Sequence, residues 1–400
     1  MKKCFVVITH VPTVAINNGF LPKILDFGYQ VVLLTDKYDE HQEILEKYQN
    51  QIKLIKANVF NPLDIITKIN QYHIEPVAVF SNSDHLQAST SIVAQFYQLP
   101  RKTWQSAIIA KNKSMMRQTL KEKQLSNIWH YHLSNNEDLN KIIDHIHFPI
   151  IAKPSFGVAS IHVEKIKNKT ELNNYCDKIW QENAETIILL EAFIEGDIFS
   201  IETLGDGKNI QVLGGFKTEI TQPPYFIETG AKWLNKFDYK ISDQLIKLLS
   251  ALNITFGACH TEFCIINDKV EIIEINYRSV GDYKEFLLNE LYGNYFETVI
   301  DLYLGKELAS LNLKYPNALI EYIPATKNGF LKNMPNEEMI ENEAITYHIN
   351  HFKEINSQIK LNFSNKDYLS SIRLYSQNQS QDDLIQKLES LKENLRWEII

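Results

Sequence analysis

The first 105 residues alternate short β-rich runs with amphipathic stretches of helical length, and this alternation constrains the fold more than any other feature of the chain. The β-rich runs are residues 4–9, 30–35, 52–56 and 77–80. Strands that alternate with helices pair in parallel, and the helices cover the faces of the sheet. The pattern therefore predicts a parallel α/β domain over residues 1–105.

Polar residues follow three of these runs, at 9–12, 35–36 and 81–84. Ligands of parallel sheets collect at the carboxyl ends of the strands. The Gly-x-Gly-x-x-Gly fingerprint of dinucleotide-binding folds is missing from the sequence. A nicotinamide cofactor is therefore not expected in this domain.

The pattern changes after the first domain. A helix over 111–124, a strand that ends at residues 152–154 and a helix over 170–183 precede a series of strands between 186 and 278. Residues 311–400 mix short strands with a polar amphipathic helix and predict a small α+β cap. With 400 residues, 44% of them hydrophobic, the chain can bury more than one core.

Charge and composition exclude several classes of partner. A formal net charge of −8, with the lysines spread along the chain, argues against nucleic acid. The apolar run from Cys4 to Ile8 is too short for a signal peptide or a membrane span. The cysteines lack the close spacing of zinc ligands, so we expect reduced thiols in a cytoplasmic protein at these positions: Cys4, Cys176, Cys259 and Cys264.

The segment that ends at Arg278 carries the clearest chemical pattern. Successive side chains of a strand point to opposite faces. Glu274, Asn276 and Arg278 are therefore expected on one face. The opposite face is expected to be core, with Ile273, Ile275 and Tyr277. A carboxylate, an amide and a cation on one face can hold a metal ion and its anion.

The preceding strand adds a second carboxylate. His260 and Glu262 share a face, and a hairpin turn at 267–268 places Glu262 opposite Glu274. Two facing carboxylates repel each other unless a cation lies between them. Oxygen ligands from Glu262, Glu274 and Asn276 suit Mg²⁺ or Mn²⁺. The alternative is a solvated hairpin face, where Glu, Asn and Arg are common.

Other segments can address a nucleotide. Lys153 ends a strand before a turn of small residues that reaches Ser160, and the backbone amides of such a turn can cover phosphates. A plain surface hairpin is the alternative. Residues 191–196 end an apolar strand, where backbone groups become available to an adenine edge. Lys113 lies at a helix start, where it can reach a phosphate, although a lone helical lysine is more often solvated.

Taken in order, these pieces resemble the ATP-grasp superfamily over about residues 105–310, and within it the carboxylate–amine ligases of the L-amino-acid ligase kind. The matching motifs are Asn112-Lys113 with Met115-Met116-Arg117, Ile151-Ala152-Lys153-Pro154, Leu190-Glu191 to Gly196 with Phe199-Ser200-Ile201-Glu202, His260-Thr261-Glu262-Phe263, and Ile273-Glu274-Ile275-Asn276-Tyr277-Arg278 with Gly281-Asp282. The resemblance implies an N-terminal α/β domain and an ATP-grasp core of two α+β lobes, 106–185 and 186–310, before the cap.

The resemblance also implies roles for the matched residues. Lys113 and Lys153 would bind the phosphates of ATP. Adenine would be held by Glu191 and the backbone groups that follow it, at Ala192, Phe193 and Ile194. Glu262, Glu274 and Asn276 would carry two Mg²⁺ ions. These assignments make ATP and Mg²⁺ the expected cofactors, with Mn²⁺ as a substitute.

Arg278 would stabilise the γ-phosphate or an acyl phosphate. Arg278 and Glu274 are both candidate catalytic residues. His260 and Glu228 are the candidates for a general base, and neither is secure. The segment 224–230 looks like one that reaches the substrate in amino-acid ligases, which makes Glu228 a candidate for binding a substrate amine. An exposed loop glutamate without a partner is the alternative.

Three positions depart from the family pattern. His162 stands in the phosphate loop where relatives tend to have glycine. Ile198 replaces a ribose-binding glutamate of many relatives, so either Glu195 or Glu202 substitutes for it or the ribose is held differently. Ala231 stands where relatives often have histidine, which affects substrate recognition more than the use of ATP.

The expected activity is an ATP- and Mg²⁺-dependent ligase that forms an acyl phosphate, transfers the acyl group to an amine, and releases ADP and phosphate. The partners would be a small carboxylic acid and an amine, amino-acid-like or natural-product in type, with no membrane partner. A homodimer is the default assembly for such folds. Two alternatives are a carboxylase-type enzyme that activates bicarbonate and an ATP-binding regulator without turnover.

Overall fold

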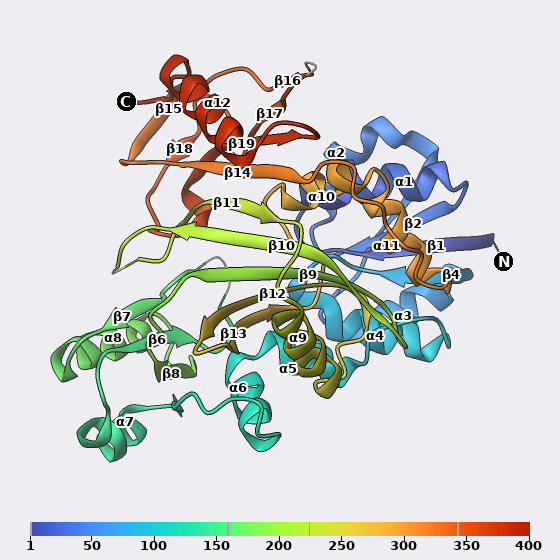
Figure 1. Cartoon of the computed structure of the whole chain (residues 1–400). Coiled ribbons are helices and arrows are strands. Elements are labelled where there is room, and N and C mark those ends of the chain that lie inside the picture. The colour runs from blue at the N-terminus through green and yellow to red at the C-terminus, as the bar shows by residue number, and fades with distance from the viewer. Residues whose placement is uncertain (1, 158–159, 224, 342–343) are drawn as a thin grey trace.

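The computed structural model describes residues 2–157, 160–223, 225–341 and 344–400. Its elements form a mixed α/β structure, as the sequence predicts, with one parallel sheet and several antiparallel sheets (Figure 1). No helix within these ranges is both long and apolar enough to cross a membrane.

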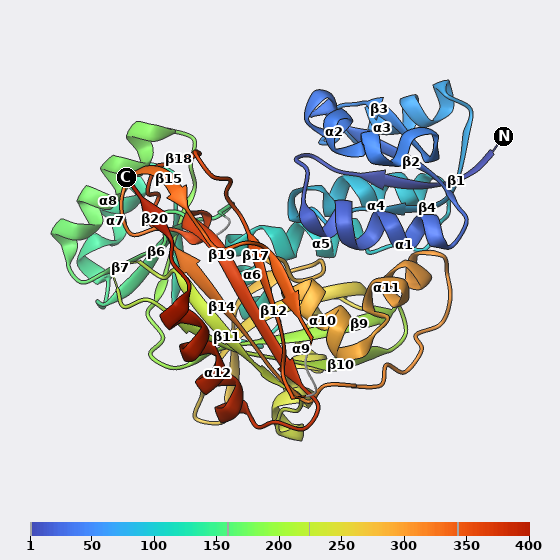
Figure 2. The same ribbon diagram turned by 90° about the horizontal axis from the view of Figure 1, so that it is seen from above.

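The N-terminal unit is a four-stranded parallel sheet in the order β3-β2-β1-β4, with helices on both of its faces (Figure 2). Its strands are β1 (Lys2–Ile8), β2 (Gln30–Thr35), β3 (Ile52–Lys56) and β4 (Ile74–Phe80). Its helical segments are η1 (Ala15–Phe20), α1 (Leu21–Asp26), α2 (Tyr38–Leu45), η2 (Glu46–Gln51), α3 (Pro62–Gln71), η3 (Asp84–Leu86) and α4 (Gln87–Phe96). Phe5 and Val7 pack in one core and Val6 and Ile8 in another, which explains the unbroken apolar run of β1.

The small lobe is an antiparallel sheet in the order β5-β8-β6-β7. Its elements are β5 (His130–Leu133), α7 (Asn136–Ile142), η4 (Ile143–His145), β6 (Ile150–Pro154), β7 (Glu164–Ile166), α8 (Lys169–Glu182) and β8 (Ile188–Ala192). Because β8 lies inside this sheet, the lobe extends past the expected boundary at residue 185 to Ala192.

The helix expected over 111–124 is α6 (Lys113–Glu122), and a further helix, α5 (Trp104–Lys111), precedes it. Asn112 separates them with an extended backbone, and its side chain accepts a hydrogen bond from the Met115 amide. An asparagine with this geometry ends one helix and caps the next. Lys113 is thereby fixed at the start of α6.

A nine-stranded antiparallel sheet forms the rest of the chain, in the order β13-β12-β9-β10-β11-β14-β19-β17-β16. Its strands are β9 (Ile198–Asp206), β10 (Ile210–Ile220), β11 (Glu228–Leu234), β12 (Phe256–Ile266), β13 (Lys269–Asn276), β14 (Asn317–Pro324), β16 (Glu338–Ile340), β17 (Thr346–His351) and β19 (Tyr368–Ser376). The helices beside it are α9 (Tyr239–Ala251), α10 (Lys284–Tyr292), α11 (Tyr295–Tyr303) and α12 (Gln381–Asn394). A short sheet adds β15 (Gly329–Asn333), β18 (Gln358–Ile359) and β20 (Glu398–Ile399), with η5 (Asn365–Asp367) nearby.

This sheet continues across the expected boundary at residue 310. β11 pairs with β14 through Gly230 and Glu321, Ala231 and Ile320, and the next pair along. The C-terminal segment, residues 311–400, is therefore an extension of the large-lobe sheet and carries its own helix, α12. Ala231 is buried in the core at this seam.

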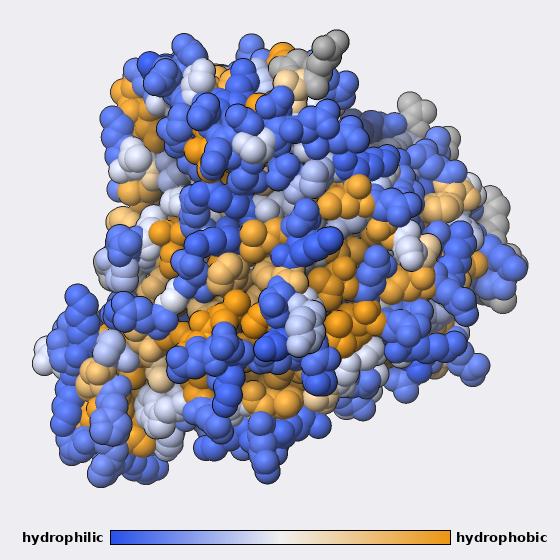
Figure 3. Space-filling model, in the orientation of Figure 1, coloured by the Kyte–Doolittle hydropathy of each residue, from blue (hydrophilic) through white to orange (hydrophobic). Residues whose placement is uncertain are grey.

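Aromatic side chains join the N-terminal unit to the large lobe. Phe20 lies 4.9 Å from Phe296 and Phe80 lies 5.0 Å from Tyr303, between ring centroids. A side chain at Gly19 would place its Cβ 2.7 Å from the Phe296 ring, so the close approach of η1 and α11 requires glycine. Figure 3 shows hydrophobic residues in a band across the middle of the molecule.

Candidate active site

A cavity of about 460 Å³ lies between the small lobe and the nine-stranded sheet. The residues predicted from sequence that line it are Lys113, Lys153, Ser160, Glu191, Ala192, Phe193, Ile194, Glu228, Glu262 and Glu274. His260, Asn276 and Arg278 are not among the described residues that line it. The structure thus gathers most of the candidate set around one space.

The hairpin between β12 and β13 forms as predicted. Asn267 and Asp268 have φ angles of 48° and 62°, the left-handed pair that a two-residue turn between strands requires. In the resulting register Glu262 lies opposite Glu274, and His260 lies opposite Asn276. Both carboxylates therefore reach the same cavity from adjacent strands.

The expected alternation of side chains fails at Ile273. Phe263 pairs with Ile272 while Glu262 pairs with Glu274, so β13 has one residue more than β12 at this point. Such a bulge turns the extra side chain to the other face. Ile273 lines the cavity instead of the core, and Ile272 takes the core position at 1% exposure.

Lys113 bridges the two lobes. Its Nζ donates to Glu274 Oε1 at 2.7 Å and to the carbonyl oxygen of Gly157 at 3.0 Å. Burial opposes its charge, but Glu274 outweighs this effect and raises the pKa of the ammonium. The side chain is buried, so the alternative of a solvated helical lysine is wrong.

Lys153 and Glu191 belong to a buried ionic cluster. The Glu191 carboxylate accepts from Arg117 Nε at 2.7 Å and from Lys153 Nζ. Burial alone would raise the pKa of Glu191, but Arg117 and Lys153 outweigh it and lower the pKa to about 2. The side chain of Glu191 is committed to these two cations, so a contact of this residue with adenine could come only from its backbone and stays a prediction. Arg117 belongs to one of the matched sequence motifs, but the sequence did not predict a role for it.

After Glu191 two backbone amides are already bonded, whereas the amides of Ile194, Glu195 and Gly196 have no partner among the described residues. The amide of Ala192 donates to the carbonyl of Trp129 at 2.9 Å, and that of Phe193 donates to the carbonyl of Pro149 at 3.3 Å. Within the described part of the chain, the Ile194 amide has no hydrogen-bond partner. The backbone donors available to a planar base therefore begin at Ile194, and not at Ala192 or Phe193.

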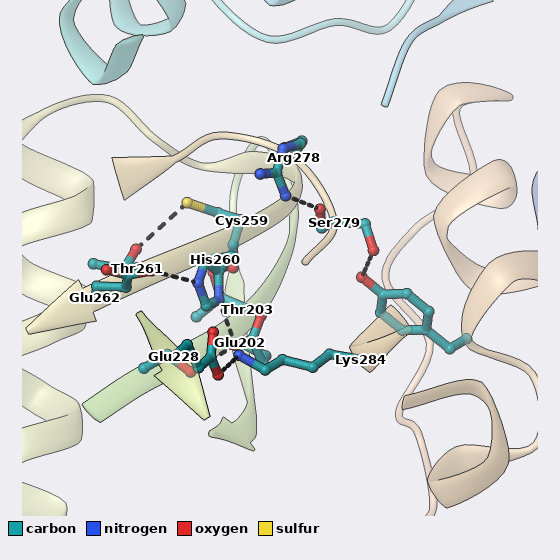
Figure 4. Close-up of polar contacts among 12 residues, drawn as sticks. Glu202, Thr203, Glu228, Cys259, His260, Thr261, Glu262, Arg278, Ser279 and Lys284 are labelled. Carbon is teal, nitrogen blue, oxygen red and sulfur yellow. Dashed lines mark hydrogen bonds and ion pairs between the residues drawn. The ribbon is translucent and has the colours of Figure 1, made fainter. Parts of the chain in front are cut away.

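His260 links two carboxylates instead of lining the cavity (Figure 4). Its Nδ1 lies 2.7 Å from Glu202 Oε1, and its Nε2 lies 3.3 Å from Glu262 Oε1. Burial lowers the pKa of the imidazole, but the two carboxylates outweigh this and raise it to about 9. A histidine that holds its proton at neutral pH is a poor general base, which argues against that expected role for His260.

Glu202 does not hold a ribose in this fold. It is 2% exposed and bonds His260 and the Ser200 hydroxyl, so its carboxylate is not available to the cavity. Ile198 and Glu195 do line the cavity. Of the two substitutes expected from the sequence, only Glu195 is in position.

Arg278 lies at the junction with the N-terminal unit. Its Nη1 donates to the carbonyl of Ser279 at 2.7 Å, and the Ser279 amide donates to Asn82 Oδ1 at 3.1 Å. Asp84 is near this loop, where Lys111 and Arg278 outweigh burial and lower its pKa. The polar residues predicted after β4 therefore meet the end of the hairpin. Asn276, largely buried, lies one step before this loop.

Glu228 has a partner that the sequence did not reveal. The Lys284 ammonium, at the start of α10, donates to the Glu228 carboxylate. Burial lowers the pKa of Lys284, but Glu228 outweighs it and raises the pKa. The alternative of an exposed glutamate without a partner is therefore wrong. No local pattern around Lys284 signals this contact, because the two residues are 56 positions apart.

The phosphate loop is only partly described. Ser160 lines the cavity with a φ of 56°, whereas Val158 and Ala159, and Pro224 of the substrate segment, lie outside the described residues. His162 pairs with Glu182 at 3.1 Å on α8. The imidazole is thereby turned toward α8, and His162 is not among the described lining residues.

The chain resembles known proteins in sequence and in fold. Residues 146–285 match the ATP-grasp domain family. The whole chain superposes on 99% of an L-amino acid ligase from Bacillus licheniformis, with a TM-score of 0.79 and 17% identity. It also superposes on all of a phosphoribosylglycinamide synthetase from Anaerococcus prevotii, with a TM-score of 0.72 and 17% identity.

A third likeness is to the biotin carboxylase domain of the Hydrogenobacter thermophilus 2-oxoglutarate carboxylase, in complex with MgADP and bicarbonate. The TM-score is 0.70 at 14% identity, and the alignment covers this whole chain and 91% of that one. At these identities the likeness concerns the fold, and it spans all the described parts of the chain, beyond the matched segment.

Proposed function

Because the chain contains an ATP-grasp domain at residues 146–285, we propose that it is an ATP- and Mg²⁺-dependent ligase that joins a carboxylic acid to an amine. One observation carries the proposal: Glu262 lies directly opposite Glu274, and both face a cavity whose other wall carries Lys153. Carboxylates on one side and cations on the other fit a metal-bound polyphosphate.

The residues present fit Mg²⁺ in a nucleotide complex better than a metal held by protein alone. Within the described ranges, no group of three or more His, Cys, Asp or Glu side chains is arranged to hold a metal ion. Mg²⁺ commonly binds through one or two carboxylates and takes its other ligands from phosphates and water. Glu262 and Glu274 would be those carboxylates. When bound, the ion neutralises charge on the terminal phosphates.

The chain's own groups would act on the reacting atoms as follows. Lys153 would bind phosphate oxygens, and Lys113 would do so on release from Glu274. A carboxylate oxygen of the acid attacks the γ-phosphorus, the bond to the β-phosphate oxygen breaks, and ADP leaves. The amine nitrogen then attacks the acyl carbon, phosphate leaves, and the amine gives up a proton. Arg278 lies where the N-terminal unit meets this end of the site and would orient the acid.

Two alternative functions can be distinguished from the ligase by experiment. A carboxylase-type reaction would use bicarbonate as the acid, as in the complex with MgADP and bicarbonate that shares this fold. A regulator without turnover would bind ATP and hydrolyse none. The altered positions His162 and Ile198 motivate this second rival, and Ile198 lines the cavity.

The proposal is tested by measuring ADP and AMP release with panels of acids and amines at saturating Mg²⁺ and ATP. We expect ADP and phosphate to appear only when an acid is present, and an amide product when an amine is added. AMP as the nucleotide product would contradict the acyl-phosphate route. Release that needs only bicarbonate would favour the carboxylase, and tight ATP binding without ADP under any mixture would favour the regulator.

A further inference from the structure

The C-terminal segment contributes one described residue to the cavity, Asn365. It begins the short helical turn η5, which Ser364 and Asp367 cap reciprocally through their side chains and backbone amides. Ser364 is 0% exposed and Asp367 is 4% exposed. A residue inside a buried reciprocal cap has a fixed backbone, so the position of Asn365 at the cavity wall is set by the fold.

The same segment holds the backbone of Glu228 on both sides. The Glu228 amide donates to Asn365 Oδ1 at 3.0 Å, and the Tyr368 hydroxyl donates to the Glu228 carbonyl at 2.8 Å. The rings of Tyr225 and Phe363 stack nearby, with centroids 4.6 Å apart. The C-terminal segment therefore fixes the strand start that carries the candidate substrate glutamate.

These contacts also decide which way the Asn365 amide points. The two ends of an asparagine amide differ in chemistry, because only the oxygen can accept a hydrogen bond from a backbone N–H. Oδ1 is therefore the end beside Glu228, and the NH₂ group is the other end. Across the described residues, Nδ2 of Asn365 has no hydrogen-bond partner. A donor that lines a cavity and has no protein partner is available to a ligand.

We infer that Asn365 is a specificity-determining residue whose NH₂ group donates to a carboxylate or carbonyl oxygen of the acid substrate. The inference rests on the proposed ligase function and deepens it. Asn365 reaches the cavity beside Glu228, whereas the available backbone donors for a base, which begin at Ile194, directly follow the last strand of the small lobe. The other acceptor chemistry within reach of such a donor is the γ-phosphate, and the experiment separates the two sources.

The test is Asn365→Asp, which keeps an oxygen for the Glu228 amide but replaces the donor with an anion. Asn328→Asp is the matched control, because Asn328 is an exposed residue of the same segment whose Oδ1 also accepts from a backbone amide, that of Leu361 at 2.8 Å. The probes are the common amino acids and simple mono- and dicarboxylic acids, titrated calorimetrically in the presence of Mg²⁺ and ADP. Mg²⁺ with a non-hydrolysable ATP analogue is titrated separately.

We expect Asn365→Asp to weaken binding of the preferred acid by about tenfold or more, with nucleotide affinity changed less than about twofold. The melting temperature without ligand should stay close to that of Asn328→Asp, which should bind both probes normally. Unchanged acid affinity overturns the inference. So does a loss confined to the ATP analogue, which would make Asn365 a phosphate ligand, or a wild-type protein that binds nucleotide but no acid of the panel.

Binding is measured without turnover, so this result is independent of the ADP assay. An acid that binds through Asn365 while no ADP is released under any mixture would contradict the ligase and leave the inference standing. Normal turnover with an acid affinity that Asn365→Asp does not change would support the ligase and contradict the inference.

Discussion

The two walls of the cavity both contain buried charges, but their balance is opposite. On the small-lobe side, Arg117 and Lys153 share a single carboxylate, Glu191. On the large-lobe side, three carboxylates line the cavity, Glu228, Glu262 and Glu274, and Glu202 lies behind them; their partners within this lobe are two cations, His260 and Lys284. One wall therefore has surplus positive charge and the other has surplus negative charge.

This difference in net charge indicates which ligand each wall can bind. Surplus cations suit phosphate oxygens, and surplus carboxylates suit a divalent metal ion. Lys113 joins the two walls, since it starts on α6 and donates to Glu274 on β13. In the structure this lysine offsets part of the charge that a metal would offset in a nucleotide complex.

The largest effect should follow from removing the carboxylate of the cationic wall. Glu191→Gln leaves Arg117 and Lys153 buried together without a counter-charge, and breaking a buried ion cluster in this way costs about 3–5 kcal/mol. The measurement is urea unfolding without ligand. Glu164→Gln is the control, because Glu164 pairs with Lys178 at 3.3 Å in a largely exposed contact worth at most about 1 kcal/mol. Similar losses in both variants would contradict the comparison.

The acid dependence of stability sharpens the same prediction. The pKa of Glu191 is lowered to about 2 from an ordinary value of 4.5. Its stabilising contribution is therefore complete above the unfolded value and is lost as pH falls from about 4.5 toward 2. We expect the difference in unfolding free energy between wild type and Glu191→Gln to shrink over this window. A difference that stays constant would mean that another group is responsible.

A smaller but more specific effect should follow on the anionic wall. Glu274→Gln removes a metal ligand while keeping the shape, and turnover should fall about a hundredfold or more. The variant should still fold but lose some unfolding free energy, because the buried Lys113 ammonium loses its carboxylate partner while the repulsion between Glu262 and Glu274 is relieved. Glu271→Gln is the control on the same strand, where Glu271 accepts from the Ser126 hydroxyl at 2.7 Å and is not among the described lining residues. Near-normal ADP release by Glu274→Gln would remove the metal site from this hairpin.

The smallest effect tests the bulge between these walls. Ile275 is 1% exposed in the core, so Ile275→Gln buries an amide and should cost roughly 1–3 kcal/mol of unfolding free energy. Ile273→Gln should cost less, because Ile273 lines the cavity and a glutamine there reaches polar space. The measurement is the unfolding free energy of both variants in urea. Equal losses of unfolding free energy in the two variants would mean that Ile273 and Ile275 share the core face, as strict alternation of side chains along the strand predicts.

Sequence pattern predicted the regular parts of the fold well. The parallel unit follows from apolar runs whose two faces are both buried, and the hairpin register follows from a two-residue turn at Asn267 and Asp268. The bulge at Ile273 was missed, because one extra residue changes no composition and only displaces the alternation. The predicted helix begins two residues too early, at Lys111 instead of Lys113, because Asn112 ends α5 and caps α6.

The charged partners of the site were the hardest to predict. Glu202 and His260 are 58 residues apart, and Arg117 and Glu191 are 74 residues apart. No periodicity along the chain connects residues at such separations, and their pairing depends on how the sheets pack. Asn365 lies 80 residues beyond the end of the segment that matches the ATP-grasp family, and no motif around it predicts a place at the cavity.

The continuity of the nine-stranded sheet bears on how this protein could be recombined with others of its fold. The small lobe is a contiguous insert, since its sheet takes every strand from residues 130–192. Exchanging that stretch with another protein would sever no β-pairing. Exchanging the C-terminal segment at residue 310 would cut β11 from β14 and expose two unsatisfied edges in the middle of a sheet. The small lobe can thus be exchanged without cutting a sheet if the contact of Glu191 with Arg117 is kept, whereas the C-terminal segment can be inherited only together with the sheet that it continues.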